Sequence, residues 1–231
     1  MQKQDQSTEA LFQQAIQAHQ SGQVQLSIEP LQQILQVQPD NDMALGMLGA
    51  VYLAMRQPQS ALPLLQKAAE VNPENVDALA NLGIALQGAG QIEQGLQQLQ
   101  QAVSHTPQRL DIRFNLANML LQVQRYEEAM QHLRTVLQQD PSFIPAYQTL
   151  AAVLGFLQRF GEAQSVYEEA IQVAPSDLQT LLLYANLLAD TAQTDLADKA
   201  YRQIIETNPQ HFLSHAAYGK FLVDIGRLAE G

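Results

Sequence analysis

A glycine-rich stretch, "GAGQIEQG" from Gly88 to Gly95, is the first candidate for chemistry in the sequence. A loop of this kind can hold a phosphate on its backbone N–H groups when it joins a strand to a following helix. The residues before Gly88, however, read as a helix rather than a strand. We therefore expect a turn between two helices here and no phosphate site.

Histidines and paired carboxylates are the other residues that could do chemistry. Only His211 and His215 have the i, i+4 spacing that places two metal ligands on one helix face, and they straddle a loop-to-helix junction with no third ligand defined. The pairs Glu127–Glu128 and Glu168–Glu169 are expected on solvated helix faces. The sequence thus predicts no catalytic residue, no metal site and no cofactor.

Composition excludes further classes of function. The chain has 231 residues, no cysteine and a formal net charge of −11, so disulfides, thiolate metal sites and cysteine nucleophiles are excluded. An acidic chain repels phosphate backbones, which makes nucleic acid a poor partner. Because no apolar run has the length of a signal peptide or a membrane span, we expect no membrane insertion and a cytoplasmic location, with the periplasm left open.

Glutamine is unusually frequent, with 37 residues scattered through segments such as "LQQILQVQ" and "QGLQQLQQAV". Glutamine has nearly the helix propensity of glutamate or lysine without the charge. We expect it to fill solvent-facing helix positions. The alternative is a glutamine-rich segment prone to aggregation.

Prolines reveal an internal repeat. Six of them are spaced 34 residues apart, at Pro39, Pro73, Pro107, Pro141, Pro175 and Pro209. With each proline at the thirty-second place, the repeats span 8–41, 42–75, 76–109, 110–143, 144–177 and 178–211, and a partial seventh spans 212–231. A fixed period of this length is typical of stacked helical hairpins.

The same frame aligns large and small apolar residues. Places seven and twenty-four are Leu or Tyr from the second repeat on, and place eight is Gly or Ala in every repeat. Small residues let two antiparallel helices approach closely, and large ones fill the space between them. With the 34-residue period, this pattern resembles the tetratricopeptide repeat family over nearly everything after Ser7.

The resemblance implies the fold. We expect an all-α, right-handed α-solenoid (superhelix) of antiparallel helix pairs, with six full 34-residue repeats and a truncated seventh. A flexible N-terminus at 1–7 would precede a single solenoid domain at 8–231. Repeat one is degenerate, with Gln14, Ala15 and Ser27 at signature places, which suits a terminal cap.

The family also implies a binding surface, since the first helix of each hairpin lines the concave groove. Asn81 and Asn115 share place six of adjacent repeats, and their amides match a peptide backbone. An equal alternative is that they bond to neighbouring helices and stabilise the stack. The groove residues that we predict are Asn81, Asn115, Asn118, Asn186, Phe114, Met47, Asp77 and Asp111.

Charge narrows the expected ligand. The groove places carry Glu9, Asp77, Asp111, Asp190 and Asp224 against Lys220. The Lys and Arg clamp for a C-terminal carboxylate, as in chaperone co-factors, is missing. We expect a protein or peptide partner that is neutral to basic, extended, and anchored by apolar side chains.

Three functions stay open at this point. The first is a non-catalytic interaction scaffold. The second is the N-terminal, partner-recruiting region of a larger enzyme of sulfotransferase or glycosyltransferase type, because the opening repeats resemble those of bacterial tetratricopeptide proteins. The third is RNA binding by a helical repeat, which the negative charge disfavours.

The end of the sequence bears on that choice. In the repeat frame Gly226 is the turn of repeat seven, Arg227 to Glu230 open its second helix, and Gly231 falls inside that helix. We expect a fragment of a longer protein. The apolar side of the last first helix, Tyr218, Leu222 and Leu228, is then expected to be exposed or covered by another molecule, which makes self-association possible.

Overall fold

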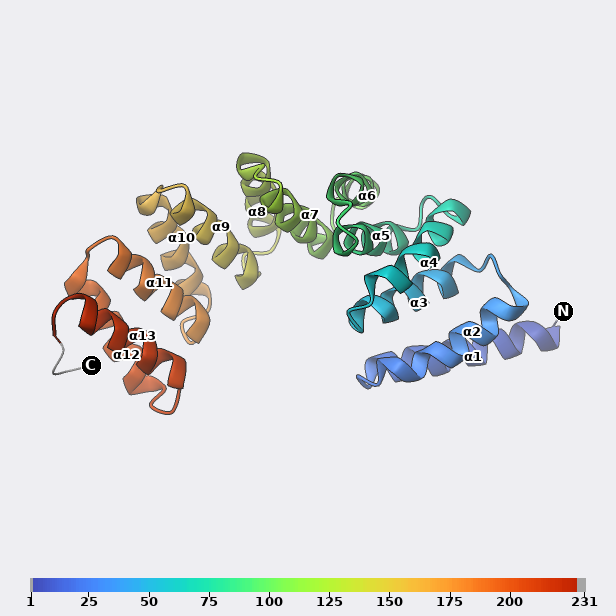
Figure 1. The fold of residues 1–231 in the computed structure, drawn as a ribbon, viewed down its shortest axis with the longest axis horizontal. Helices are drawn as coiled ribbons and strands as arrows, with labels where there is room; N and C mark the ends of the chain where they lie inside the picture. The colour runs from blue at the N-terminus through green and yellow to red at the C-terminus, as the bar shows by residue number, and fades with distance from the viewer. Residues whose placement is uncertain (1, 228–231) are drawn as a thin grey trace. The chain divides into compact units, whose positions relative to one another are not determined.

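The computed structural model describes the backbone of residues 2–227 and the side chains of residues 7–227. Within these residues the chain forms thirteen α-helices and one short 3-10 helix, with no strand. The expected all-α fold is confirmed, and the two helices of each hairpin that lies within one of the units described below pack as antiparallel neighbours (Figure 1). None of the described helices is long and apolar enough to cross a membrane.

The chain divides into two compact units, 1–125 and 126–231, and each is described on its own. The first contains α1 (Gln2–Gln20), η1 (Val24–Ser27), α2 (Ile28–Val37), α3 (Asp42–Ala54), α4 (Pro58–Val71), α5 (Val76–Gly88), α6 (Ile92–His105) and α7 (Leu110–Gln122). The second contains α8 (Tyr126–Gln139), α9 (Ile144–Phe156), α10 (Phe160–Val173), α11 (Leu178–Asp190), α12 (Thr194–Thr207) and α13 (Phe212–Asp224). A single solenoid over 8–231 stays a prediction.

Helix starts follow the sequence frame closely. At place thirty-four, four side chains cap the next first helix: Asn41, Asn75, Asp177 and His211 each accept a hydrogen bond from the N–H three residues on, whereas Arg109 and Phe143 form no such cap. Helix α1 is the exception, because it begins at Gln2. Most of the segment 1–7 that we expected to be flexible therefore belongs to this helix, in keeping with its glutamines and lysine.

The turn inside each hairpin uses a left-handed residue. Gly90 has φ +79° and Gly226 has φ +79°, as expected from their places in the frame. Non-glycine residues take the same conformation at the same place in other repeats: Arg56, Gln124, Gln158 and Ala192. The turn geometry is therefore set by the hairpin, and glycine is favoured there without being required.

Close packing in the first unit rests on glycine. A Cβ added at Gly83 would lie 2.8 Å from Leu99 Cγ and 3.0 Å from the carbonyl oxygen of Gly95. A Cβ added at Gly49 would likewise lie too close to the Leu65 side chain. In this unit the leucine of the second helix packs directly over the glycine backbone of the first helix, as the small and large places predict.

Tyrosines replace those leucines in the second unit. The Tyr201 ring, 2% exposed, lies 5.6 Å from the Tyr218 ring and 5.3 Å from the Phe221 ring between centroids. Tyr167 and Tyr184 make a similar pair, with ring centroids 6.4 Å apart. Aromatic pairs thus contribute to the contact between successive hairpins here.

The prediction for the last described helix was wrong in its residues. Leu222 is 1% exposed and Tyr218 is half-buried, because both pack against α12 in the core of the second unit. The exposed apolar side chains of α13 are instead Phe212, Leu213 and Val223. Leu228 and the rest of the expected second helix lie outside the described residues.

Candidate functional site

A cavity of about 250 Å³ opens on the first helices of residues 1–125, and we call it the first-helix cavity. It brings together Met47, Asp77 and Asn81 of the predicted groove, from α3 and α5. Phe12 of α1 and Met43 of α3 add apolar surface, and Met43 is 65% exposed. Methionine adapts to varied partners because its side chain is flexible and polarizable.

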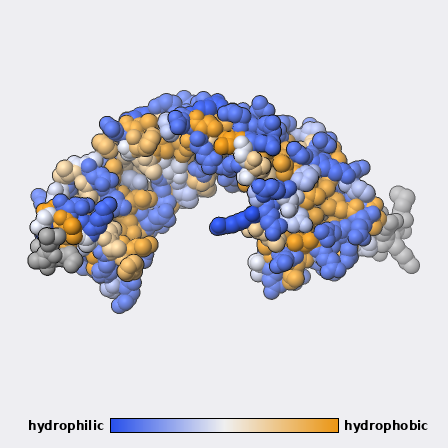
Figure 2. Space-filling model, in the orientation of Figure 1, coloured by the Kyte–Doolittle hydropathy of each residue, from blue (hydrophilic) through white to orange (hydrophobic). Residues whose placement is uncertain are grey.

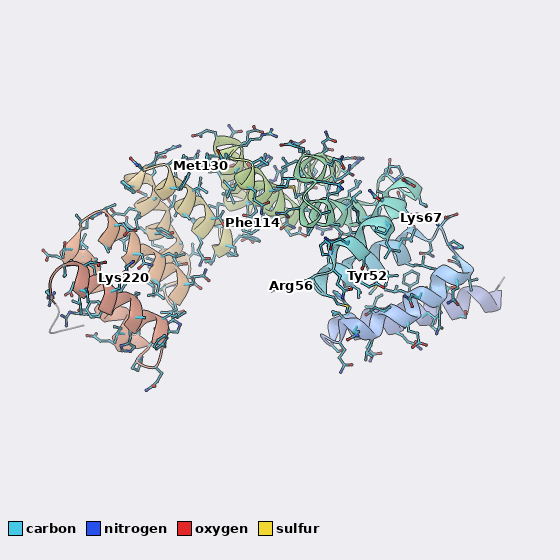
Figure 3. All side chains as sticks on the ribbon, viewed as in Figure 1. Tyr52, Arg56, Lys67, Phe114, Met130 and Lys220 are labelled. Carbon is cyan, nitrogen blue, oxygen red and sulfur yellow. The ribbon has the colours of Figure 1, made fainter. Side chains whose placement is uncertain are left out.

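Three asparagines on the first helices of this unit keep their amides available. Asn81 on α5, and Asn115 and Asn118 on α7, are half-buried. Among the described residues, the hydrogen bonds include none made by these three side chains, and none of the three is a fully buried, unsatisfied group. The alternative that Asn81 and Asn115 bond to neighbouring helices therefore finds no support in the described residues. Figure 3 labels Phe114, which precedes Asn115 on α7.

Arg109 changes the electrostatics of the predicted acidic surface. Its guanidinium lies 3.0 Å from Asp77 and 2.9 Å from Asp111, so it joins the two carboxylates that we expected to face the groove. Its hydrogen bond to Asp111 lowers the pKa of that carboxyl group below its usual value, against the raising effect of burial. The sequence pattern does not identify Arg109, because this residue precedes the first helix of its repeat. Its position directly before Leu110, where α7 begins, is the feature that could have pointed to it.

In the second unit, a cavity of about 580 Å³ joins α11, α12 and α13. It is lined by the predicted Asn186 and by Asp190, Lys220 and Asp224, and Figure 3 labels Lys220 on α13. The exposed Asn186 accepts a hydrogen bond of 2.5 Å from the Tyr201 hydroxyl. This asparagine is therefore partly engaged by its own hairpin, and the cavity is more highly charged than the first-helix cavity.

The two spaced histidines serve the helix start. His211 Nδ1 lies 2.7 Å from Ser214 Oγ, and His215 Nε2 lies 2.9 Å from the Pro209 carbonyl oxygen. No group of three or more potential metal ligands gathers anywhere in the described residues. Gly90 lies in the turn between α5 and α6, and Gly95 is buried inside α6, so the glycine-rich stretch is a hairpin turn and the start of the second helix, as expected.

Comparisons with known proteins agree with this architecture. Two family models, both described as "Tetratricopeptide repeat", match residues 52–103 and 86–154, and residues 144–177 and 178–211. Together these matches cover more than half of the chain. No curated protein matches the sequence.

Several solved structures share the fold. The chain is similar to PilF of Pseudomonas aeruginosa, with a TM-score of 0.76, 21% identity, and coverage of 96% of this chain and 99% of PilF. A tetratricopeptide repeat protein from Parabacteroides merdae gives a TM-score of 0.74 at 18% identity, covering 95% of this chain and 87% of that one. YrrB gives 0.64 at 14% identity, covering 83% and 98%. The chain therefore belongs to the tetratricopeptide repeat family, whose fold supports a role as a protein-interaction scaffold.

Proposed function

We propose that residues 1–125 bind an extended peptide segment of a partner protein on their first helices. The available amides of Asn81, which lines the first-helix cavity, and of Asn115 and Asn118 on α7, the next first helix, are the observation that carries this proposal. The first-helix cavity takes an apolar side chain of the segment, and the asparagines hold its backbone.

The amides suit a backbone without reading its sequence. Each asparagine side chain offers two donors and one acceptor, which matches the N–H and C=O groups of an extended peptide. Each such hydrogen bond contributes about 0.5–1.5 kcal/mol net. Most of the affinity then comes from the apolar side chain held against Phe12, Met43 and Met47, because a few anchors dominate most interfaces.

The charges favour a neutral or basic segment. Asp77 and Asp111 share Arg109, which leaves one net negative charge in this group of three. The chain as a whole carries −11. An acidic segment would be repelled over the range at which exposed charges act, which is about 8–10 Å at physiological salt.

One neighbour in fold points to the same class of ligand. YrrB is described as a TPR protein with an unusual peptide-binding site. That description belongs to YrrB; for this chain it supports a peptide as the class of ligand and says nothing about which residues hold it.

A random-peptide phage library panned on the whole 231-residue chain tests the proposal. The variant Asn115→Ala with Phe114→Ala serves as the comparison, because it removes one amide and one apolar side chain from α7. We expect peptides selected on the wild type to contain apolar residues, to lack acidic ones, and to bind the double variant about tenfold or more weakly.

Circular dichroism and the matched variant Asn186→Ala provide the controls. Helicity of the double variant should equal that of the wild type, and Asn186→Ala, in the other unit, should leave binding unchanged. The proposal is contradicted if the selected peptides bind the double variant with the affinity of the wild type, or if panning enriches no peptide.

A further inference from the structure

A second cleft lies on the opposite helices of the first unit, between α4 and α6, and we call it the glutamine valley. Its volume is about 480 Å³. The leucines of α5 form its floor: Leu79, Leu82 and Leu86 are 2%, 5% and 3% exposed. Its polar walls are made by Gln66, Glu70, Gln94, Gln97, Gln98 and Gln101.

The walls are almost uncharged. Glu70 is the one charged residue lining the glutamine valley, within a chain of net charge −11. A helix surface that only faces solvent can use lysine or glutamate as well as glutamine. Covering a charged wall costs far more than covering an amide, which needs only a new hydrogen-bond partner. The amide walls are therefore suited to being covered by an uncharged segment.

Gln101 shows the kind of contact that these walls make. Its Nε2 donates to the Pro73 carbonyl oxygen at 3.4 Å, so a glutamine of α6 reaches a backbone group at the end of α4. This contact closes one end of the glutamine valley. Gln97 and Gln98 stand one turn earlier on α6 and can offer the same amide to an incoming backbone.

The dimensions favour an extended segment. The walls run from Gln66 to Pro73 and from Gln94 to Gln101, which is two helical turns or about 10 Å. An extended chain covers that distance in about three residues. A helix of about 10 Å diameter would have to displace the glutamine side chains to reach the leucine floor.

We propose that the glutamine valley binds an uncharged, extended peptide segment of a partner, about three residues long. A central apolar side chain rests on Leu79, Leu82 and Leu86, and Gln97 and Gln98 hold the backbone. The charge match selects against acidic residues. This surface is distinct from the first-helix cavity and does not depend on it.

The corresponding cleft of the second unit, between α10 and α12, provides the comparison. Ala200 stands where Gln98 stands in the first unit, and Ile171 stands where Ala69 does, so its walls are more apolar. Gln203 is the one glutamine that lines it, at the place of Gln101. Gln203→Ala is therefore a matched control for changes in the glutamine valley.

Nuclear magnetic resonance of the ¹⁵N-labelled chain tests the proposal with a defined probe, acetyl-Gln-Leu-Gln-amide. We expect the probe to shift the side-chain amide signals of Gln97 and Gln98 and to leave that of Asn81 unchanged. The double variant Gln97→Ala, Gln98→Ala should bind about tenfold more weakly, because two backbone contacts are lost. Gln203→Ala should bind as the wild type does.

The acidic probe acetyl-Glu-Leu-Glu-amide tests the charge argument, and we expect it to bind more weakly than the neutral one. Alanine favours helix at both substituted positions, so the double variant should stay folded, which circular dichroism checks. The proposal is overturned by any of three results: no shifts up to about 10 mM probe, equal binding of the acidic probe, or unchanged affinity in the double variant.

Discussion

The two units build the same hairpin with different contacts, and the difference shows what the repeat frame demands. In the first unit, leucine packs on glycine, and Gly83 has no room for a Cβ. In the second, alanine takes place eight in α9 and α11, where Ala151 and Ala185 are 1% and 0% exposed, and Tyr201 stacks on Tyr218 and Phe221 of the next hairpin. A glycine at place eight is therefore required where the leucine of the second helix lies directly against its backbone, as Leu99 does at Gly83.

Surfaces differ between the units along with the cores. The first-helix cavity is rich in methionine and amides, while the cavity between α11 and α13 carries Asp190, Lys220 and Asp224. Figure 2 shows the hydrophobic side chains reaching the surface in small patches among hydrophilic ones. Ligands of the two cavities should therefore differ in salt dependence, which is greater where charges line the cavity.

The largest effect on stability should come from a change at place eight of the first unit. Gly83→Ala forces Leu99 and the Gly95 backbone apart, and we expect it to lower the free energy of unfolding by about 1–3 kcal/mol. Gly219→Ala in α13 meets no atom of the described residues and improves helix propensity, so we expect no loss and a gain of up to about 1 kcal/mol. Urea unfolding followed by circular dichroism measures both.

If the two variants unfolded at the same urea concentration, the close packing assigned to Gly83 would be wrong. Gly161, another helical glycine with no atom within 4 Å of an added Cβ, provides a second control. Gly161→Ala should behave like Gly219→Ala.

The next largest expected effect is at alkaline pH, where the two units should lose their native packing at different pH values. Burial raises the pKa of Tyr167, Tyr184, Tyr201 and Tyr218 to about 12, whereas residues 1–125 contain a single tyrosine, Tyr52. A raised tyrosine pKa contributes stability that is fully present below the unfolded value of about 10 and is lost as pH rises through the folded value. The second unit should therefore lose its native packing first.

Methyl resonances of the two cores report this order. We expect the signals of Leu188 and Ile204 to lose their native shifts at lower pH than those of Leu82 and Leu99. Tyr201→Phe removes one ionisation and should move the loss in the second unit to higher pH. Simultaneous loss in both units would contradict the assignment.

The sequence predicted the elements well because a period of 34 fixes helix pairs, turns and small places together. The turn glycines Gly90 and Gly226 are where the frame puts them. The sequence predicted less well which neighbouring residues an individual side chain contacts. Leu222 is buried because α12 covers it, and Asn186 is bonded because Tyr201 reaches it. Neither contact follows from a place number.

Arg109 is the clearest example of a residue whose contacts the repeat positions do not predict. Breaking its bridge gives the smallest predicted effect on stability. Its bridge to Asp77 and Asp111 has a counterpart in the second unit, where Arg159 lies 3.2 Å from Glu127 and 2.7 Å from Glu162. Two bridges of the same kind, built from different places, should respond to acid in the same direction.

Asp111→Asn isolates the first bridge. The Asp111 side chain is 59% exposed, so solvent screening limits its contribution to less than about 1 kcal/mol. Because its pKa is lowered by Arg109, the stabilisation is present above the unfolded value of about 3.9 and disappears as pH falls through the folded value. Wild type and variant should differ slightly in urea midpoint at neutral pH and converge in acid. A difference that persisted in acid would mean that Asp111 acts through packing, and the two bridges would then not be equivalent.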